Sequence, residues 1–206
     1  LTNPIKNEIV IEKIANIYLS DFKMKTIIKP KNIKISGEGT YSFDNSNFLN
    51  FNLENKLNND GSNLKLNFDY KNNIELELIN YKKPEKNVAN LFLNLEKKKN
   101  NLKINQLNYK ETNNLIKIEG LRFKENKLLS FKKVEVLLAN NAFIIEKNKK
   151  ILIKGNKFDA TNLAKVFKKQ KKENILQKID SNIEIDFKNI NVPMSEKLQN
   201  FKLIGE

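Results

Sequence analysis

The stretch LFLNLEKKKNNLKINQLNY, residues 91–109, indicates the fold class because apolar and polar side chains alternate along it. Leu91, Leu93 and Leu95 occupy every second position, and Leu102 and Ile104 resume the pattern after a run of Lys and Asn. Successive side chains of a β-strand point to opposite faces of the sheet. The stretch therefore predicts two strands, each with one apolar and one polar face, joined by a tight turn.

The same alternation continues on both sides of this hairpin. It is present in NIKISGEGTYSF (32–43), FLNFNLENKL (48–57), SNLKLNFDY (62–70), NIELELINY (73–81), NLIKIEGLRF (114–123), FKKVEVLL (131–138) and KILIKG (150–155). Short connections rich in Asn, Lys, Asp and Gly separate these segments, without the helical patterns that parallel βαβ units require. We predict a mainly β fold, an antiparallel amphipathic meander that forms a curved, groove-like sheet.

The apolar face of such a sheet has to be covered or occupied. A second sheet can pack on it, the sheet can close into a barrel, or the face can form a trough for an apolar ligand. The sequence alone does not choose between a dry core and a lipid-filled groove. The candidate groove-lining residues are Leu91, Leu93, Leu95, Leu102, Ile104, Ile116, Ile118, Val134, Val136, Leu138, Ile151, Ile153, Ile183, Ile185 and Phe187.

The amino-acid composition excludes several classes of function. The 206 residues include no cysteine and no histidine, which removes disulfides, thiolate metal sites and histidine-based catalysis. Carboxylate-only chemistry stays open, but a pair such as Glu75 and Glu77 on an expected strand is better explained as a solvated face. We expect a protein that is not an enzyme and that needs neither a metal ion nor a cofactor.

The net charge of +14 raises the question of a nucleic-acid partner. Arg122 is the single arginine, whereas base-edge and phosphate recognition favours the planar guanidinium of arginine. An AT-rich genome would also produce an excess of Lys, Asn, Ile and Phe without any selected polyanion. We therefore expect no nucleic-acid partner and keep polyanion binding as a third alternative.

One segment, ILIKGNKFDATNLAKVF (151–167), departs from the alternation. We expect the strand to end at Gly155, because glycine adopts turn conformations that β-branched residues do not. Asp159 or Thr161 can then cap a short helix near residues 160–178, with Leu163 beginning its apolar stripe. This helix would cover one end of the sheet, or form a lid over a groove mouth or a contact with anionic lipid.

Alternation returns after the helix in SNIEIDFKNINVP (181–193) and KLQNFKLIGE (197–206). Taken with 151–167, this order resembles the repeat of the AsmA-like proteins of bacterial envelopes, in particular the YhdP type, with TamB-type proteins as relatives. The structural motif of that repeat falls on Gly155, Phe158, Asp159 and Leu163, followed by strand positions Ile183, Ile185, Phe187, Leu198 and Leu203. The resemblance is clearest over 145–206 and only general over 1–144.

The resemblance implies a large envelope protein that is anchored in the inner membrane and crosses the periplasm. Its curved sheet would form a long apolar groove along which phospholipid acyl chains move between the inner and outer membranes. Residues 1–206 would be one elongated β domain, a periplasmic segment of that longer chain. Its partners would be phospholipid acyl chains, a membrane reached through parts of the parent outside this sequence, and other envelope proteins.

A second interpretation has no lipid conduction. In it, the chain is a structural or assembly β-domain of the bacterial envelope, with a closed core and with contacts made through its sheet edges. The two interpretations differ in whether the apolar face is sealed within the domain or stays open along its length.

Overall fold

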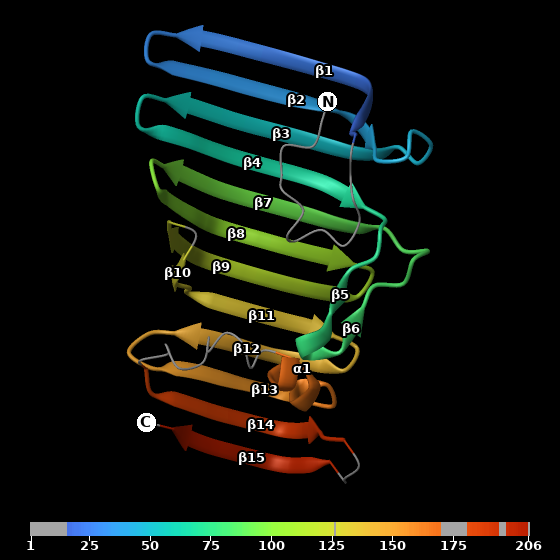
Figure 1. Cartoon of the computed structure of the whole chain (residues 1–206), viewed down its shortest axis with the longest axis vertical. Helices are drawn as coiled ribbons and strands as arrows, with labels where there is room; N and C mark the ends of the chain where they lie inside the picture. The colour runs from blue at the N-terminus through green and yellow to red at the C-terminus, as the bar shows by residue number, and fades with distance from the viewer. Residues whose placement is uncertain (1–15, 126, 170–180, 194–196, 206) are drawn as a thin grey trace.

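The structure is a computed structural model, and it describes residues 16–125, 127–169, 181–193 and 197–205. It confirms a mainly β fold built on one large, curved sheet that does not close on itself (Figure 1). The sheet has thirteen strands, in the spatial order β1-β2-β3-β4-β7-β8-β9-β11-β12-β13-β14-β15, with β10 beside β9. Neighbours in the sheet are therefore almost always neighbours in the sequence, as expected of a meander.

The strands of the large sheet are long, and most have the positions that the alternation predicts. They are β1 (Tyr18–Lys29), β2 (Asn32–Ser42), β3 (Leu49–Asn58), β4 (Gly61–Tyr70), β7 (Ala89–Lys98), β8 (Asn101–Glu111), β9 (Asn114–Lys124), β10 (Lys127–Ser130), β11 (Lys133–Leu138), β12 (Asn141–Lys147), β13 (Ile151–Asp159), β14 (Ile183–Asn191) and β15 (Leu198–Gly205). Strands β1, β10 and β12 were not among the expected strands, and β1 is the longest of them. The alternation of β1 is interrupted by a β-bulge between Ser20 and Lys23, at which Asp21 has a φ of 51°.

One pair of neighbouring strands is parallel, contrary to the expectation of a wholly antiparallel meander. Ile151, Ile153 and Gly155 of β13 pair in parallel with Ile183, Ile185 and Phe187 of β14. The helix α1 (Leu163–Lys169) lies in the connection between these two strands. A parallel pair needs such a crossover because its second strand must start again at the same end of the sheet. The remainder of the predicted helix lies outside the described residues.

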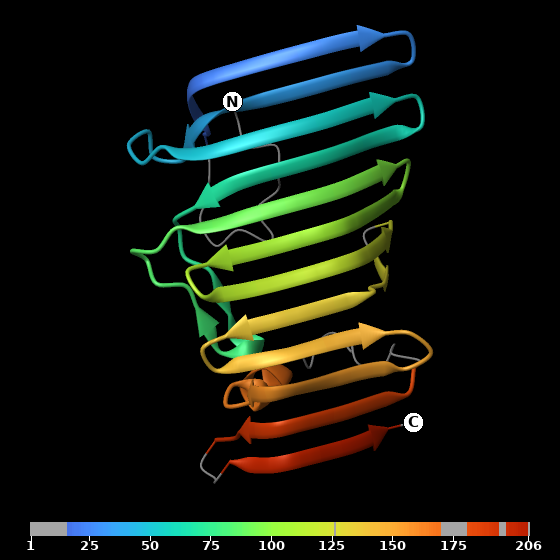
Figure 2. The ribbon, with the colours of Figure 1, turned by 180° about the vertical axis from the view of Figure 1, so that it is seen from behind.

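The expected strand over 73–81 is wrong. The chain leaves the large sheet between β4 and β7 and forms a small excursion, residues 71–88, which contains β5 (Glu75–Leu76), the 3₁₀ turn η1 (Glu77–Ile79) and β6 (Tyr81–Lys82). Asn80 ends η1 in a left-handed conformation with a φ of 48°, and this residue reverses the chain. In Figure 1 the excursion and α1 lie in front of the sheet, whereas Figure 2 shows the sheet from the opposite face.

The expectation that β13 ends at Gly155 is also wrong. The strand continues to Asp159, and Gly155 pairs with Phe143 on one side and with Phe187 on the other. A Cβ atom at residue 155 would lie 2.3 Å from the carbonyl oxygen of Ala142 and 2.5 Å from the Cβ of Phe143. Glycine is therefore required here for close approach of two strands at a β-bulge, and not for a turn.

Candidate functional site

The apolar residues of successive strands are in register across the whole sheet. Residues that pair directly across two strands share a face, so the pairing defines rows that run across the strands. One row, which we call the aliphatic row, contains Met24, Gly37, Leu53, Leu66, Leu93, Leu107, Ile118, Val134, Ile145, Ile153, Ile185 and Leu203. It extends from β1 to β15 without a charged residue.

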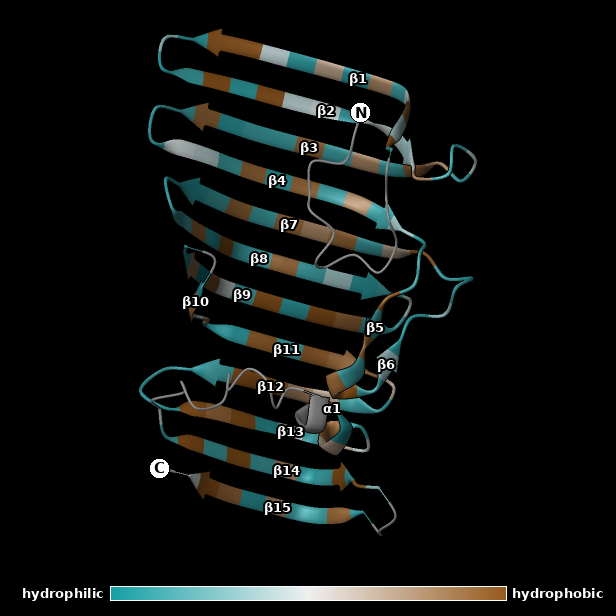
Figure 3. Ribbon diagram, viewed as in Figure 1, coloured by the Kyte–Doolittle hydropathy of each residue, from teal (hydrophilic) through white to brown (hydrophobic). Residues whose placement is uncertain are grey.

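A second row lies two residues further along each strand. This aromatic row contains Gly39, Phe51, Phe68, Leu91, Tyr109, Ile116, Val136, Phe143, Gly155, Phe187 and Phe201. Together the two rows form the centre of what we call the apolar face, and Figure 3 shows apolar segments, in brown, alternating with polar segments along the strands of the sheet.

All of the predicted groove-lining residues lie on this face. Nine belong to the two rows above, namely Leu91, Ile116, Val136 and Phe187 in the aromatic row and Leu93, Ile118, Val134, Ile153 and Ile185 in the aliphatic row. Beyond the aliphatic row, Leu95 pairs with Ile104, and Ile151 pairs with Ile183. By alternation within their strands, Leu102 and Leu138 also point to the apolar face.

The upstream part of the apolar face was not among the predicted residues. Phe22 at the β1 bulge has its ring centroid 5.8 Å from that of Phe51. The nearest side-chain atoms to a Cβ built at Gly37 belong to Phe22, and the backbone of Phe22 lies 2.9 Å from a Cβ built at Gly39. The sequence SGEG in a strand pattern is the signal for this close approach, because glycine within a strand marks a bulge or a packed neighbour.

The apolar face is covered at one end of its strands and half-exposed elsewhere. Val136 is 4% exposed and Phe187 is 3% exposed, and both belong to a buried cluster that includes Ile79 of the excursion and Ala160 before α1. Val134, Ile153 and Ile185 of the aliphatic row are only partly buried. At the two outer strands, Met24 is 63% exposed and Leu203 is 45% exposed. Among the described residues, the face therefore has a closed end and an open remainder.

A buried lysine holds the excursion together internally. The Lys83 side chain is fully buried, and its Nζ donates hydrogen bonds to the carbonyl oxygens of Lys71 (2.6 Å), Pro84 (3.0 Å) and Asn87 (2.7 Å). These three acceptors satisfy all three protons of an ammonium group. Burial nevertheless lowers the pKa of Lys83 from its usual value, which the nearby carboxylate of Glu111 partly offsets.

A buried carboxylate joins the excursion to the sheet. Glu111, which is 1% exposed, accepts hydrogen bonds from the Tyr81 hydroxyl at 3.0 Å and from the amide groups of Asn87 and Asn114. Burial alone would raise the pKa of Glu111, but these hydrogen bonds outweigh it and hold the pKa below its ordinary value of 4.5. Burial raises the pKa of Tyr81, whose hydroxyl also shares a 2.5 Å hydrogen bond with that of Tyr109.

A third polar contact joins the excursion, β13 and the start of α1. Asp159 is buried, and its carboxylate accepts hydrogen bonds from the Asn80 amide (2.9 Å) and the Thr161 hydroxyl (2.6 Å). Asn141 accepts a hydrogen bond from the backbone N–H of Asp159 and donates one to the carbonyl of Ile79. The motif residue Asp159 thus fixes the cover over the apolar face. No sequence signal singled out Asn80 or Asn141, because isolated asparagines are abundant in this chain.

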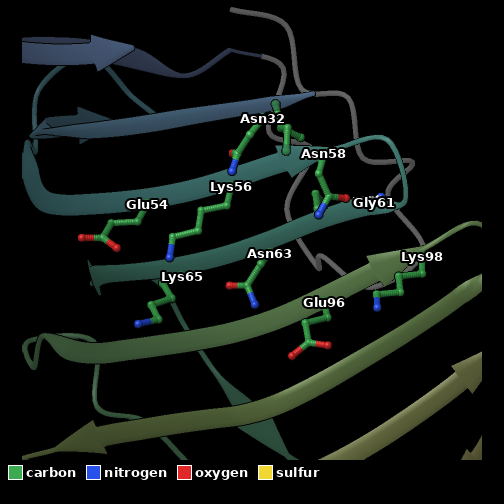
Figure 4. A pocket seen from close by; sticks show the side chains of 11 residues that line it. Asn32, Glu54, Lys56, Asn58, Gly61, Asn63, Lys65, Glu96 and Lys98 are labelled. Atoms are coloured by element: carbon green, nitrogen blue, oxygen red, sulfur yellow. Dashed lines mark hydrogen bonds between the residues drawn. The ribbon is translucent and has the colours of Figure 1, made fainter. Parts of the chain in front are cut away.

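The opposite face of the sheet is polar. Figure 4 shows a shallow hollow on it, lined by lysine, glutamate and asparagine side chains of β3, β4 and β7, including Lys56, Lys65 and Glu96. These residues alternate along their strands with members of the apolar face. Opposite charges are interspersed here, as is typical of a solvated sheet surface.

Within the described part of the chain, no helix is long and apolar enough to span a membrane, and no three carboxylates converge as metal ligands would. Comparisons with protein-family models, curated proteins and solved structures found no match to this chain.

Proposed function

We propose that this chain is a segment of an AsmA-like envelope protein whose apolar face carries phospholipid acyl chains between the inner and outer membranes. The observation that carries the proposal is the aliphatic row, which crosses the large sheet from β1 to β15 without a charge and stays partly exposed over most of its length. Transport of this kind requires no reaction chemistry. It requires a continuous surface on which methylene groups leave water.

The dimensions of the row suit acyl chains. Neighbouring strands lie about 4.8 Å apart, so the row from β1 to β15 is about 50 Å long. One acyl chain spans half of a bilayer core, about 15 Å, so the row is about three times as long as one chain. Each methylene removed from water contributes about 0.8 kcal/mol, so a chain is held by contact along the row without a closed pocket. Because no step along the row differs sharply from the next, a bound chain can shift from strand to strand.

Lipid analysis of the purified chain tests this function. The protein is expressed with a bacterial periplasmic signal, purified without detergent and examined by native mass spectrometry. We expect adducts with the masses of phospholipids, and transfer of fluorescent phosphatidylcholine between two vesicle populations that is faster than without protein. Lipid-free protein that also fails to accelerate transfer would contradict the proposal.

The alternative function is a structural or assembly β-domain of the envelope. It is favoured by the exposed apolar side chains on the outer strands, because Ile28 of β1 and Ile204 of β15 are 76% and 79% exposed. Unpaired edge strands with such residues are suited to pairing with another chain. This function predicts concentration-dependent association of the purified chain, measurable by analytical ultracentrifugation, without lipid adducts.

A further inference from the structure

The hairpin turns on one side of the sheet are unusually rich in lysine. Their sequences are KPKN (29–32), NNDG (58–61), KKKNN (97–101), KENK (124–127) and KNKK (147–150). All of these lysines are exposed except Lys147, which is partly buried. The acidic residues in the same turns are Asp60 and Glu125. We call this side of the sheet the basic rim.

The strand pairing places these turns side by side. Asn32 pairs with Asn58, Ser62 with Lys97, and Asn101 with Lys124, so consecutive turns lie at the same ends of their strands. Figure 1 shows them along the left side of the sheet, and Figure 2 shows them along the right side. The lysines therefore form a line that runs parallel to the rows of the apolar face.

The other side of the sheet has a different charge pattern. The excursion (71–88) contains Glu75, Glu77 and Glu85 in addition to its lysines, the β2–β3 turn contains Asp44, and β13 ends at Asp159. Positive charge is thus concentrated on the side away from the cover. A composition bias toward lysine alone would not separate the two sides in this way.

Polar side chains also enter the apolar face next to the basic rim. Lys97 pairs with Ser62 and Leu102, and Lys147 pairs with Ile151, so both lysines lie on the apolar face itself. Asn55, between Ile35 and Leu64, has a buried side-chain oxygen with no hydrogen-bond partner in the described part of the chain. Along each strand, the apolar face thus changes from mixed polar and apolar residues at the basic rim to the two apolar rows, and then to the end that the excursion covers.

We propose that the basic rim and the apolar face together bind a phospholipid with a net negative headgroup. This inference rests on the proposed lipid-carrying function and adds the class and orientation of the lipid. The headgroup phosphate lies among the lysine ammonium groups, and the acyl chains run along the strands toward the excursion. Two residues of a strand span about 6.6 Å, so a chain of about 15 Å starting at Lys97 ends between the aliphatic and aromatic rows.

The test compares two charge-matched variants. In the rim variant, Lys97→Gln, Lys99→Gln, Lys147→Gln and Lys149→Gln remove four positive charges from the basic rim. In the control variant, four exposed lysines away from the rim lose their charge, two in the excursion (Lys82→Gln and Lys86→Gln) and two near the opposite ends of β8 and β13 (Lys110→Gln and Lys157→Gln). A third variant carries Arg at the four rim positions and keeps the charge. Circular dichroism and the thermal midpoint show whether each variant is folded.

Binding is measured with fluorescent phosphatidylglycerol, which is anionic, and with phosphatidylcholine of the same acyl chains, which is zwitterionic. A lysine near an anionic lipid headgroup strengthens association roughly fivefold at low salt, so we expect the rim variant to lose phosphatidylglycerol binding by about tenfold or more. Its phosphatidylcholine binding should stay within about twofold of the wild type. The control and arginine variants should bind both lipids as the wild type does.

Several outcomes would overturn the inference. Equal loss of phosphatidylglycerol binding in the rim and control variants would show that only net charge matters. If the wild type binds both lipids equally and the rim variant has no effect, the preference for an anionic lipid is refuted and the proposed function remains. Failure to bind either lipid would contradict the proposed function itself. Binding of a DNA duplex to the basic rim without lipid binding would assign the lysines to a polyanion instead.

Discussion

A single lysine in the aliphatic row should interrupt lipid binding. Val134 lies on β11 in the middle of this row, between Ile118 and Ile145. In Val134→Lys, the ammonium group stays hydrated, so about three or four methylene groups of a bound acyl chain next to β11 are no longer buried against the row. At about 0.8 kcal/mol for each methylene, the loss is about 3 kcal/mol, which corresponds to roughly hundredfold weaker binding. The cost of placing lysine in hydrocarbon is of the same size, about 2.5–3.5 kcal/mol.

The same strand provides the matched control. Leu137 lies on the opposite face of β11 and is 48% exposed, so Leu137→Lys adds the same charge without entering the row. The assay is the dissociation constant of fluorescent phosphatidylcholine, with phospholipid adducts counted by native mass spectrometry. Because a positive charge attracts the phosphate group, a loss of binding in Val134→Lys reports the apolar contact alone. Equal binding by the two variants, both folded by circular dichroism, would refute the role of the row.

Three further predictions concern the excursion, its contact with Glu111, and the close approach of two strands at Gly155. Lys83→Met should lower the free energy of unfolding by about 2–3 kcal/mol in urea titrations, because three buried carbonyl groups lose a charged donor. Glu111 has a pKa below 4.5 in the folded state, so its stabilisation is complete above the unfolded-state value and is lost as the pH falls through the folded-state pKa. In Glu111→Gln, the free energy of unfolding should therefore decrease less steeply as the pH falls, which we call a flatter acid limb. Gly155→Ala should destabilise by about 2 kcal/mol or more, measured by thermal unfolding, because its Cβ meets Phe143 and a backbone carbonyl.

Each of these variants has a control and an outcome that would contradict it. Lys82→Met, at the exposed neighbour of Lys83, should leave stability unchanged, and an equal effect at both positions would exclude the hydrogen bonds as the cause. Glu75→Gln should retain the wild-type acid limb, and an unchanged limb in Glu111→Gln would show that Glu111 does not control it. Gly205 has open space around its missing Cβ, so Gly205→Ala should be tolerated, and a stable Gly155→Ala would refute the steric argument.

The alternation of side chains is enough to predict the sheet, because a period of two leaves few alternatives for segments such as 91–109. It also places Val134 and Ile153 on the apolar face, since each belongs to an unbroken alternating run. It does not predict the rows, because register depends on turn geometry and on bulges such as the one at Gly155. Strand β1 was missed for the same reason, since the bulge at Asp21 interrupts its period.

The cover over the apolar face could not be predicted from the sequence. Residues 73–81 alternate like a strand, but Asn80 reverses the chain there, and the Glu111 and Asp159 contacts join groups far apart in the sequence. A buried lysine has the same appearance as an exposed one in a chain so rich in lysine. The lysine runs of the turns were visible in the sequence, but only the register shows that they lie along one side of the apolar face.

The near-sequential order of the strands has a consequence for how the size of this protein can change. Within the large sheet, each hairpin pairs only with the strands beside it, so none is needed to close a ring, and among the described residues only the excursion reaches further, to Asp159 of β13. Duplicating or deleting one would lengthen or shorten the sheet by about 10 Å and leave the width of every remaining strand as it is. The length of the sheet is thus proportional to the number of hairpins. Adding or removing hairpins can therefore match the sheet to a given distance without changing the remaining ones.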